Sequence, residues 1–493
     1  MKTVFLLIGA LLLSVVAGVA SDSPEKPATE IITSTAPPAP PALPEGTMWR
    51  TIVGEKFVKE TRFTIDVIAS EGFSVDNTSD SSQQGAGGGA NDPNGAPGDT
   101  GSNFNYAYVI IHRDMKTNLL PRITPLPGPS PVKADWDIEA DVAYGRDCQG
   151  ARMAGWDTHW GVNEPGATSP ALAAANRQNF VCTPNMYGQI YLPFFKGIAI
   201  TGGRYGSGLG WEIPLDLSNG PNYFYSHTYD MYSSSLQVLG VLASANLMRS
   251  QKHGYLLAEL GLNNGEQTSV SPGGNTMGSF DGAIRWASPR MSSSLAYAFR
   301  IGNANIKTNA QGAPINTTDF GPLYTVLSPK GQLRQRHSIV ATRQFNSHWN
   351  AEAEAVYFRQ DGDNQASTIW AFGGPHYGGS RAAGVNGRAI YAVNPRLSTG
   401  IRLETFHTPD GFFLLPLNLH YVNGVPTLSK GYFNDVTLGA NYWPIKNMRF
   451  RPEVRYDWNN NSAFGTGNAS VLAGLRNPQK SQITWNMDML FYF

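Results

Sequence analysis

The stretch FRPEVRYDW at residues 450–458 alternates between apolar and charged side chains. Successive side chains of a β-strand point to opposite faces, so the alternation predicts a strand with one apolar and one polar face. With the preceding residue included, the polar face carries Arg449, Arg451, Glu453, Arg455 and Asp457. A tilted strand needs about 9 to 11 residues to cross a bilayer, and this segment has that length.

The same alternation recurs along the chain from residue 62 to the last residue. Clear cases are residues 136–147, 349–359, 432–443 and 483–493. Turn residues separate the runs, which gives a count of about sixteen strands. We expect the strands to begin near residues 62, 105, 135, 186, 197, 235, 255, 279, 291, 333, 349, 387, 397, 432, 448 and 483.

Short and long connections alternate between these strands. Short ones are predicted near residues 195–196, 251–254, 289–290, 346–348, 394–396 and 444–447, and long ones at 76–103, 148–186, 206–234, 264–278, 304–332, 361–386, 408–430 and 459–481. Short periplasmic turns, long extracellular loops and an even strand number are typical of outer-membrane barrels. The connection at 117–134 breaks the pattern, because it is long for a periplasmic turn. The predicted fold is therefore an all-β, transmembrane antiparallel β-barrel.

A soluble β-sandwich or propeller would show the same alternation, with the apolar face turned to a core. Two features favour the membrane barrel. Aromatic residues such as Trp349, Tyr442 and Trp458 lie at strand ends, where a barrel has its interfacial girdles. The chain also ends on Phe493 in an aromatic strand that is similar to the signal read by the barrel-assembly machinery.

The N-terminal residues predict export. Lys2 is followed by an apolar run and by small residues up to Ala20, a pattern typical of a signal peptide over residues 1–20. Residues 21–60 include a tract rich in Pro, Thr and Ala and predict a periplasmic spacer, so the barrel would occupy residues 61–493. The expected location is the outer membrane of a bacterial cell, with its lipid as a partner.

The composition excludes several classes of protein. The 493 residues contain 37 Lys and Arg against 37 Asp and Glu, and charged residues make up only 15%. This balance disfavours nucleic-acid binding. Two cysteines cannot build a Cys-rich metal centre, and no complete motif for a phosphate cradle, a calcium loop or a zinc protease occurs. We therefore expect no cofactor, no resident metal and no enzyme activity.

The charges on the inward faces of the strands are the candidate functional groups, because the wall of a water-filled barrel decides which ions enter it. Ordinary ion pairs that hold loops in place are an equally good interpretation of these charges. The predicted pore-lining residues are Arg449, Arg451, Glu453, Arg455, Asp457, Asp137, Glu139, Asp141, Arg402, Glu404, Arg388 and Arg285.

The loop at residues 206–234 is the best candidate for a constriction, because it follows an early strand and is rich in Gly and aromatic residues. It would either fold into the pore or lie flat on the rim. Its candidate residues are Glu212, Asp216, Tyr223, Tyr225, His227, Tyr229 and Asp230. In an oxidising compartment Cys148 and Cys182 are expected to form one disulfide.

Two regions, one at residues 202–227 and one at residues 436–458, resemble the OmpL-like beta-barrel porin family. Residues 202–212 are similar to its "Gly-Lys-aromatic … Gly-Tyr-Glu" element, with Arg204 in place of Lys and Trp211 in place of Tyr. Residues 222–227 are similar to its "Asn-aromatic-Tyr-Ser" element, and residues 436–442 and 451–458 resemble its last long strands. The resemblance implies an outer-membrane diffusion channel and implies no particular solute.

The expected function is passive diffusion of small hydrophilic solutes and ions through a water-filled channel. A substrate-specific channel for sugars or anions is the alternative, and a barrel enzyme or an adhesin is a third. A homotrimer is expected from other porins, although no residue pattern here decides it.

Overall fold

The computed structural model describes residues 46–77, 101–145, 147–151, 153, 156–157, 181–206, 208–212, 222–232, 237–265, 278–303, 333–360, 379–414, 419–422, 425–461, 464 and 479–493. The predicted signal peptide, most of the predicted spacer and most of the 76–103 loop lie outside these residues.

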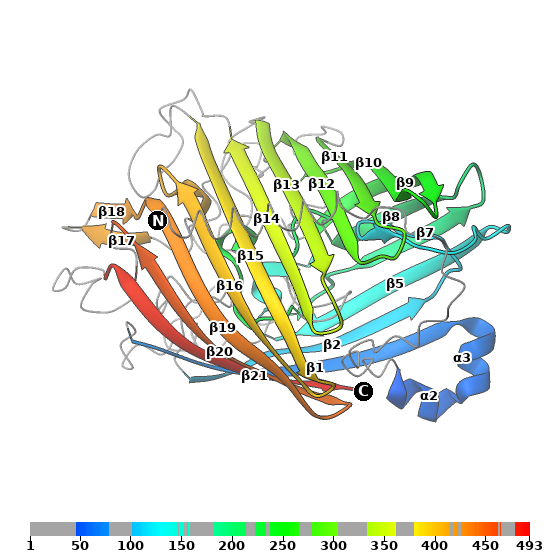
Figure 1. Cartoon of the computed structure of the whole chain (residues 1–493), viewed down its shortest axis with the longest axis horizontal. Coiled ribbons are helices and arrows are strands. Elements are labelled where there is room, and N and C mark those ends of the chain that lie inside the picture. The colour runs from blue at the N-terminus through cyan, green and yellow to red at the C-terminus, as the bar shows by residue number, and fades with distance from the viewer. Residues whose placement is uncertain are drawn as a thin grey trace.

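Sixteen long strands form a closed antiparallel barrel, which confirms the predicted fold class (Figure 1). Neighbouring strands pair in chain order, and β1 also pairs with β21 to close the barrel. The terminal Phe493 takes part, because its N–H donates to the Val67 carbonyl at 2.9 Å. The strands are β1 (Phe63–Asp76), β2 (Gly101–Arg113), β5 (Asp135–Tyr144), β7 (Met186–Leu192), β8 (Ile198–Gly206), β9 (Gln237–Ser250), β10 (Gly254–Asn263), β11 (Ser279–Ala287), β12 (Ser293–Asn303), β13 (Leu333–Gln344), β14 (Trp349–Gln360), β15 (Ser380–Asn394), β16 (Leu397–Thr408), β19 (Gly431–Ile445), β20 (Met448–Asn459) and β21 (Ser481–Tyr492).

Smaller elements decorate the connections. They are α2 (Thr47–Val53), α3 (Glu55–Thr61), β3 (Leu119–Leu120), β4 (Thr124–Pro125), α4 (Cys148–Ala151), β6 (Val181–Cys182), α6 (Tyr229–Tyr232), η5 (Phe412–Leu414), β17 (Leu419–Val422) and β18 (Val425–Leu428).

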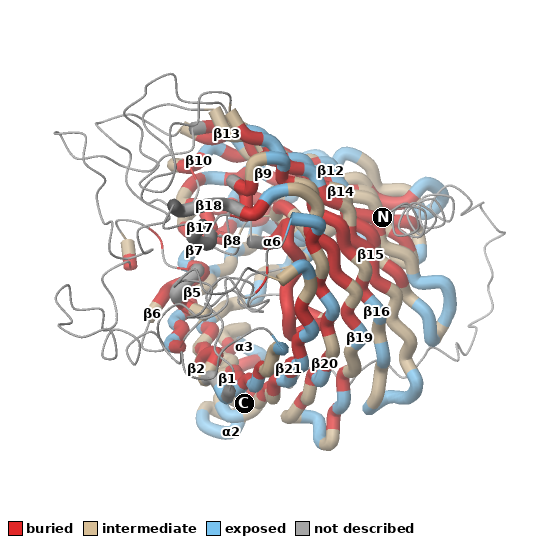
Figure 2. Tube along the Cα trace, turned by 90° about the vertical axis from the view of Figure 1, so that its left-hand side faces the viewer, coloured by how far each residue is buried: buried red, intermediate tan, exposed pale blue. Residues whose placement is uncertain are grey.

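Burial alternates along the strands with the period that the sequence predicts (Figure 2). On β20, Arg451 and Arg455 are buried in the barrel interior, whereas the neighbouring Tyr456 is 43% exposed on the outside. Apolar side chains such as Leu438 and Trp485 likewise lie on the outer surface. The barrel therefore has an apolar outer surface and an interior that holds the charged groups, the distribution that is typical of a membrane barrel.

Pro452 is tolerated in the middle of β20 because it interrupts only one ladder. Pairing between β19 and β20 is continuous up to Gly439 and Glu453 and resumes in the same register at Tyr442 and Phe450. Proline has no N–H to donate, so a local break of this kind is expected. On the other side Pro452 keeps its place opposite Met487 of β21.

The largest error in a predicted strand boundary concerns β15, and β2 also begins earlier than predicted, at Gly101 and not near residue 105. Strand β15 begins at Ser380, not near residue 387, so the predicted 361–386 loop is shorter. The sequence of this stretch, SRAAGVN, is rich in small residues and looks like a loop. Small residues are needed there because a β-carbon at Gly384 would lie 2.7 Å from the Phe406 ring inside the barrel.

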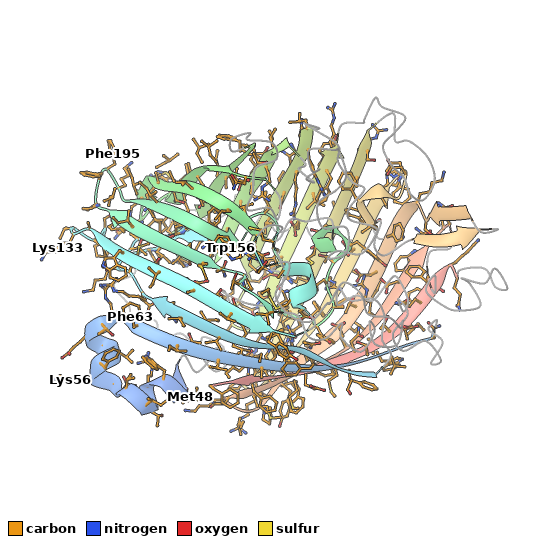
Figure 3. All side chains as sticks on the ribbon, turned by 180° about the vertical axis from the view of Figure 1, so that it is seen from behind. Met48, Lys56, Phe63, Lys133, Trp156 and Phe195 are labelled. Carbon is orange, nitrogen blue, oxygen red and sulfur yellow. A yellow bond between two sulfur atoms is a disulfide. The ribbon has the colours of Figure 1, made fainter. Side chains whose placement is uncertain are left out.

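Two short helices that were not predicted, α2 and α3, precede the barrel. They lie beside the start of β1 at the end of the barrel that carries the short turns (Figure 1). Met48 and Lys56 mark them, and Phe195 and Lys133 mark the turns at the same end (Figure 3). The Trp49 indole N–H donates to the Phe63 carbonyl at 3.2 Å, which fixes α2 to the first strand.

No helix within the described residues is long and apolar enough to span a membrane.

The outer face of β19 gives a test of the membrane orientation. Leu438 is 56% exposed at the centre of β19, and Tyr442 lies on the same face nearer its end. An arginine on the lipid face costs about 2–4 kcal/mol at the midplane and about 0–1 kcal/mol near the interface. We expect Leu438→Arg to lower the free energy of unfolding in liposomes by that larger amount, and Tyr442→Arg to have little effect. Equal losses for the two variants would contradict the orientation.

Candidate functional site: the lumen of the barrel

One sector of the lumen wall, formed by β16, β19, β20 and β21, carries a dense set of buried ion pairs. Arg451 binds Asp488 through two hydrogen bonds of 2.7 and 2.6 Å. Arg455 donates to Asp457 at 2.7 Å and lies 3.5 Å from Asp435, which also neighbours Arg402 at 3.6 Å. Each of these side chains is at most 2% exposed. Buried charges are tolerated only when they are paired and hydrogen-bonded, as these are.

The guanidinium groups of this sector also bind the loop between β8 and β9. Arg451 Nη1 donates to the Asn222 carbonyl at 2.5 Å, and Arg402 Nη1 donates to the Ser226 carbonyl at 2.6 Å. Arg455 Nη1 donates to the carbonyl of the next residue, His227. Residues 222–232, called the inner loop segment from here on, therefore lie inside the barrel against this wall.

Carboxylates of the same sector bind the N–H groups of the inner loop segment. Glu453 accepts from Tyr225 N at 2.9 Å and from Ser226 N at 3.1 Å. Glu404 accepts from Tyr229 N at 2.8 Å, and the Tyr229 hydroxyl donates to Asp457 at 2.7 Å. A hydrogen bond to a charged group contributes about 1.5–3 kcal/mol. Groups of both signs thus hold the backbone of the segment in one position.

Glu212 connects the first part of the loop to the same network. It accepts from Thr228 N at 2.8 Å and from Arg402 Nη1 at 3.1 Å, and it lies 3.4 Å from the His227 ring. Burial by itself raises the pKa of Glu212, but Arg402, His227 and Arg388 together hold it below its usual range. The group is therefore a carboxylate at neutral pH, and it fixes two parts of the loop to each other.

Glycines on the inward face of the wall make room for the aromatic residues of the inner loop segment. A β-carbon at Gly439 would lie 2.9 Å from the Phe224 ring, and one at Gly400 would lie 2.6 Å from the Tyr223 ring. Tyr225 reaches the opposite side of the closure, where its hydroxyl donates to Asn105 at 2.9 Å. The sequence analysis did not predict these contacts. The available signal was the presence of glycines at inward-facing positions of long strands.

Among the described residues, the lumen has a cavity on the other side of the inner loop segment. A cavity of about 430 Å³ is lined there by inward residues of β11 to β15 and by the loop. Several of the wall side chains that point into the cavity are small, namely Ser294, Ala296 and Ala298 of β12 and Ser338 of β13. The charged residues that line it are Arg122, Arg285, Arg388, Arg449, Glu212 and Glu352.

Within this cavity arginines outnumber carboxylates, although several of the groups are paired. Arg388 donates to Glu352 on the neighbouring strand. Arg285 donates to Glu259 at 2.8 Å and to the Gly208 carbonyl at 2.7 Å. Arg449 donates to the Asn441 side chain at 2.7 Å. The described lining therefore presents four arginines and two glutamates to the cavity.

The predicted pore-lining residues fall into three groups. Arg285, Arg388 and Arg449 line the cavity, whereas Arg402, Glu404, Arg451, Glu453, Arg455 and Asp457 lie behind the inner loop segment. The third group faces inward from β5 and meets neutral partners: Gln189 donates to Asp137, Tyr187 to Glu139 and Tyr108 to Asp141. A role in lining the pore stays a prediction for all of them.

The predicted constriction residues gather in the lumen. Glu212 and Tyr223 line the cavity, and Tyr225, His227, Tyr229 and Asp230 are buried in the inner loop segment. Asp216 lies outside the described residues. The sequence element at residues 222–227 is thus the part of the loop that the charged wall binds.

A disulfide joins Cys148 to Cys182 at the base of the loop between β5 and β7. Beside it Arg204 donates to Asp157 at 2.5 Å, and both side chains are fully buried. Asp157 also accepts from Met153 N at 2.6 Å and Thr183 N at 2.9 Å. The covalent link and the ion pair hold the two ends of this loop together, and both cysteines pack against residues of β2 and β5.

Several solved structures are similar to this chain at low sequence identity. The outer membrane channel DcaP of Acinetobacter baumannii is 9% identical over 87% of this chain and 97% of its own, with a TM-score of 0.47. OprB of Pseudomonas putida is 12% identical over 90% of this chain and 97% of its own, with a TM-score of 0.47. An anion-selective porin from Comamonas acidovorans is 9% identical over 87% and 99%, with a TM-score of 0.45.

No curated protein matches the chain. The family described as "Putative beta-barrel porin-2, OmpL-like" matches residues 71–493, which include every strand from β2 to β21 and the loop segments that line the lumen. This match confirms the family resemblance seen in the motifs at residues 202–212 and 222–227. The chain therefore belongs to the OmpL-like beta-barrel porin family and is a porin of the bacterial outer membrane.

Proposed function

We propose that solutes cross this porin through the passage between the loop and the wall of β11 to β15, and that the passage favours small anions. The observation that carries the proposal is the cavity of about 430 Å³ with its four arginines and two glutamates. A fixed excess of guanidinium groups raises the local concentration of anions. The effect is strong only where the pore is narrower than about one Debye length, ~8 Å at physiological salt.

The wall of β16 to β21 has a different role in this proposal. Its arginines and carboxylates are buried under the inner loop segment and bind its backbone. They act on permeation by holding the loop in the lumen, and the loop narrows the pore. This role combines the two interpretations of the lumen charges, since ion pairs that hold a loop also set the size of the passage.

The family and the lumen support a channel rather than an enzyme. The aromatic residues Trp211 and Tyr223 line the passage. They would allow stacking of a sugar ring, so a substrate-specific channel remains the alternative. Block of the ion current by added sugars distinguishes the two, because a general porin has no site that the sugar saturates.

Recording from the purified protein in planar bilayers tests the proposal. We expect stepwise conductance. Under a KCl gradient the reversal potential should have the sign of the chloride equilibrium potential. Arg388→Gln should reduce the permeability ratio of chloride to potassium, because Arg388 lines the passage. Arg290→Gln, in the exposed turn between β11 and β12, is the matched control. A cation-selective wild-type pore would contradict the proposed anion preference.

The seat of the inner loop segment gives a second prediction. In Gly439→Leu the new side chain meets the Phe224 ring and must displace the loop from the wall toward the passage. We expect a lower single-channel conductance than in the wild-type protein. Ala440→Leu places the same leucine side chain on the outer face one residue later and should conduct normally. Equal conductance in both variants would show that the loop does not border the passage.

The homotrimer and the recognition of the C-terminal strand by the assembly machinery stay predictions. Phe493 pairs with Val67 at the closure of the barrel, which supports a role for the last strand in assembly. Native mass spectrometry of the detergent-solubilised protein measures the oligomeric state directly.

A further inference from the structure

The connection between β2 and β5 is too long for a periplasmic turn because its middle part enters the barrel. Its short strands β3 and β4 form a hairpin, with Leu119 opposite Pro125 and Leu120 opposite Thr124. Leu119 is fully buried against Ala199 of β8 and Leu257 of β10. Both wall residues point into the lumen, so the hairpin lies inside the pore.

Polar contacts fix the base of the hairpin to neighbouring strands. The Asn118 amide donates to the Lys196 carbonyl at 2.7 Å, in the turn between β7 and β8. Asn246 of β9 donates to Asn118 Oδ1 at 2.8 Å, and Arg249 donates to the Asn118 carbonyl at 3.0 Å. These bonds hold the hairpin at a defined depth.

The tip of the hairpin is Arg122, which has a left-handed backbone with φ of 70°. Its N–H donates to Glu259 at 2.6 Å, and its Nη1 donates to the Gly206 carbonyl at 3.2 Å, where the loop after β8 begins. Its guanidinium lies over the rings of Tyr187 and Tyr205, at 4.9 and 5.3 Å from their centroids. The side chain therefore sits between the wall and the loop.

Arg122 and the neighbouring Ile123 both line the passage. Arg122 thus meets the extracellular loop from the periplasmic side, at the place where Arg285 binds the Gly208 carbonyl. We propose that residues 117–126 form a second constriction that enters from the periplasmic end, and that Arg122 is a selectivity-determining residue that favours anions.

The proposal follows from where the charge lies. A guanidinium fixed at a narrow point acts on each ion at short range, and there it is screened less than a charge at the wide mouth. The backbone N–H of Arg122 occupies one oxygen of Glu259, and Arg285 occupies the other. The Ser244 hydroxyl also donates to Glu259, at 2.9 Å, so this carboxylate is engaged by three donors. Arg122 adds a positive charge to the passage.

This inference rests on the proposed function, and charge reversal tests it in planar bilayers. Arg122→Glu should lower the permeability ratio of chloride to potassium. Lys133→Glu makes the same change of charge in the same connection, at an exposed position near the mouth, and should leave the ratio close to that of the wild-type protein. If Arg122→Glu does not fold, Arg122→Gln replaces it, with a smaller decrease expected.

A thiol label tests the position of the hairpin separately. The two natural cysteines are joined in a disulfide, so Ile123→Cys carries a single reactive thiol. A bulky anionic methanethiosulfonate should form a mixed disulfide there, release methanesulfinate and reduce the current. The same label at Lys133→Cys should leave the current unchanged.

The possible failures are distinguishable. A wild-type protein without stepwise conductance would overturn the proposed function. A conducting protein whose permeability ratio is unchanged in Arg122→Glu or Arg122→Gln would overturn the selectivity role of Arg122 alone. An unchanged current after labelling of Ile123→Cys would overturn the placement of the hairpin in the passage.

Discussion

The architecture of the lumen depends on hydrogen bonds between buried charges of the wall and the backbone of one loop. Removing an arginine or a carboxylate from water costs several kcal/mol unless partners replace the water. On β16 to β21 the charges pair with one another, and further donors and acceptors of Arg402, Arg451, Glu404 and Glu453 bind the N–H and carbonyl groups of residues 222–232. The wall and the loop therefore supply hydrogen-bond partners for each other's buried polar groups.

This constraint divides the lumen into two unequal parts. The sector with large charged residues is filled by Tyr225, Tyr229 and their neighbours, whereas the sector with Ser and Ala residues borders a cavity among the described residues. The charge of the cavity comes from groups that line it, among them Arg388 on the wall and Arg122 on the periplasmic hairpin. In the proposed function, a wide barrel of sixteen strands is narrowed in this way to a passage with defined charge.

The sequence predicts the barrel well because its signal is local. Period-two alternation places Arg451 and Arg455 on the inner face and Tyr456 on the outer face, as the structure has them. It cannot predict what covers the inner face, because Tyr225 and Glu453 meet across 228 residues of chain. Gly400 and Gly439 look like weak strand residues until the rings of Tyr223 and Phe224 are seen against them. The sequence indicates that the 117–134 connection is long for a periplasmic turn. Its path into the lumen depends on contacts with β8, β9 and β10, which are distant in the sequence.

Native-state hydrogen exchange of the amides of Tyr225, Ser226 and Tyr229 measures whether the charged wall holds the backbone of the loop. These amides donate to Glu453 and Glu404 inside the barrel. We expect these amides to exchange as slowly as those of the neighbouring strands β16 and β20. Glu453→Ala should accelerate exchange at Tyr225 and Ser226, and Glu404→Ala should accelerate exchange at Tyr229. Exchange in the wild-type protein as fast as that of the exposed turn amides Lys252 and His253 would contradict it.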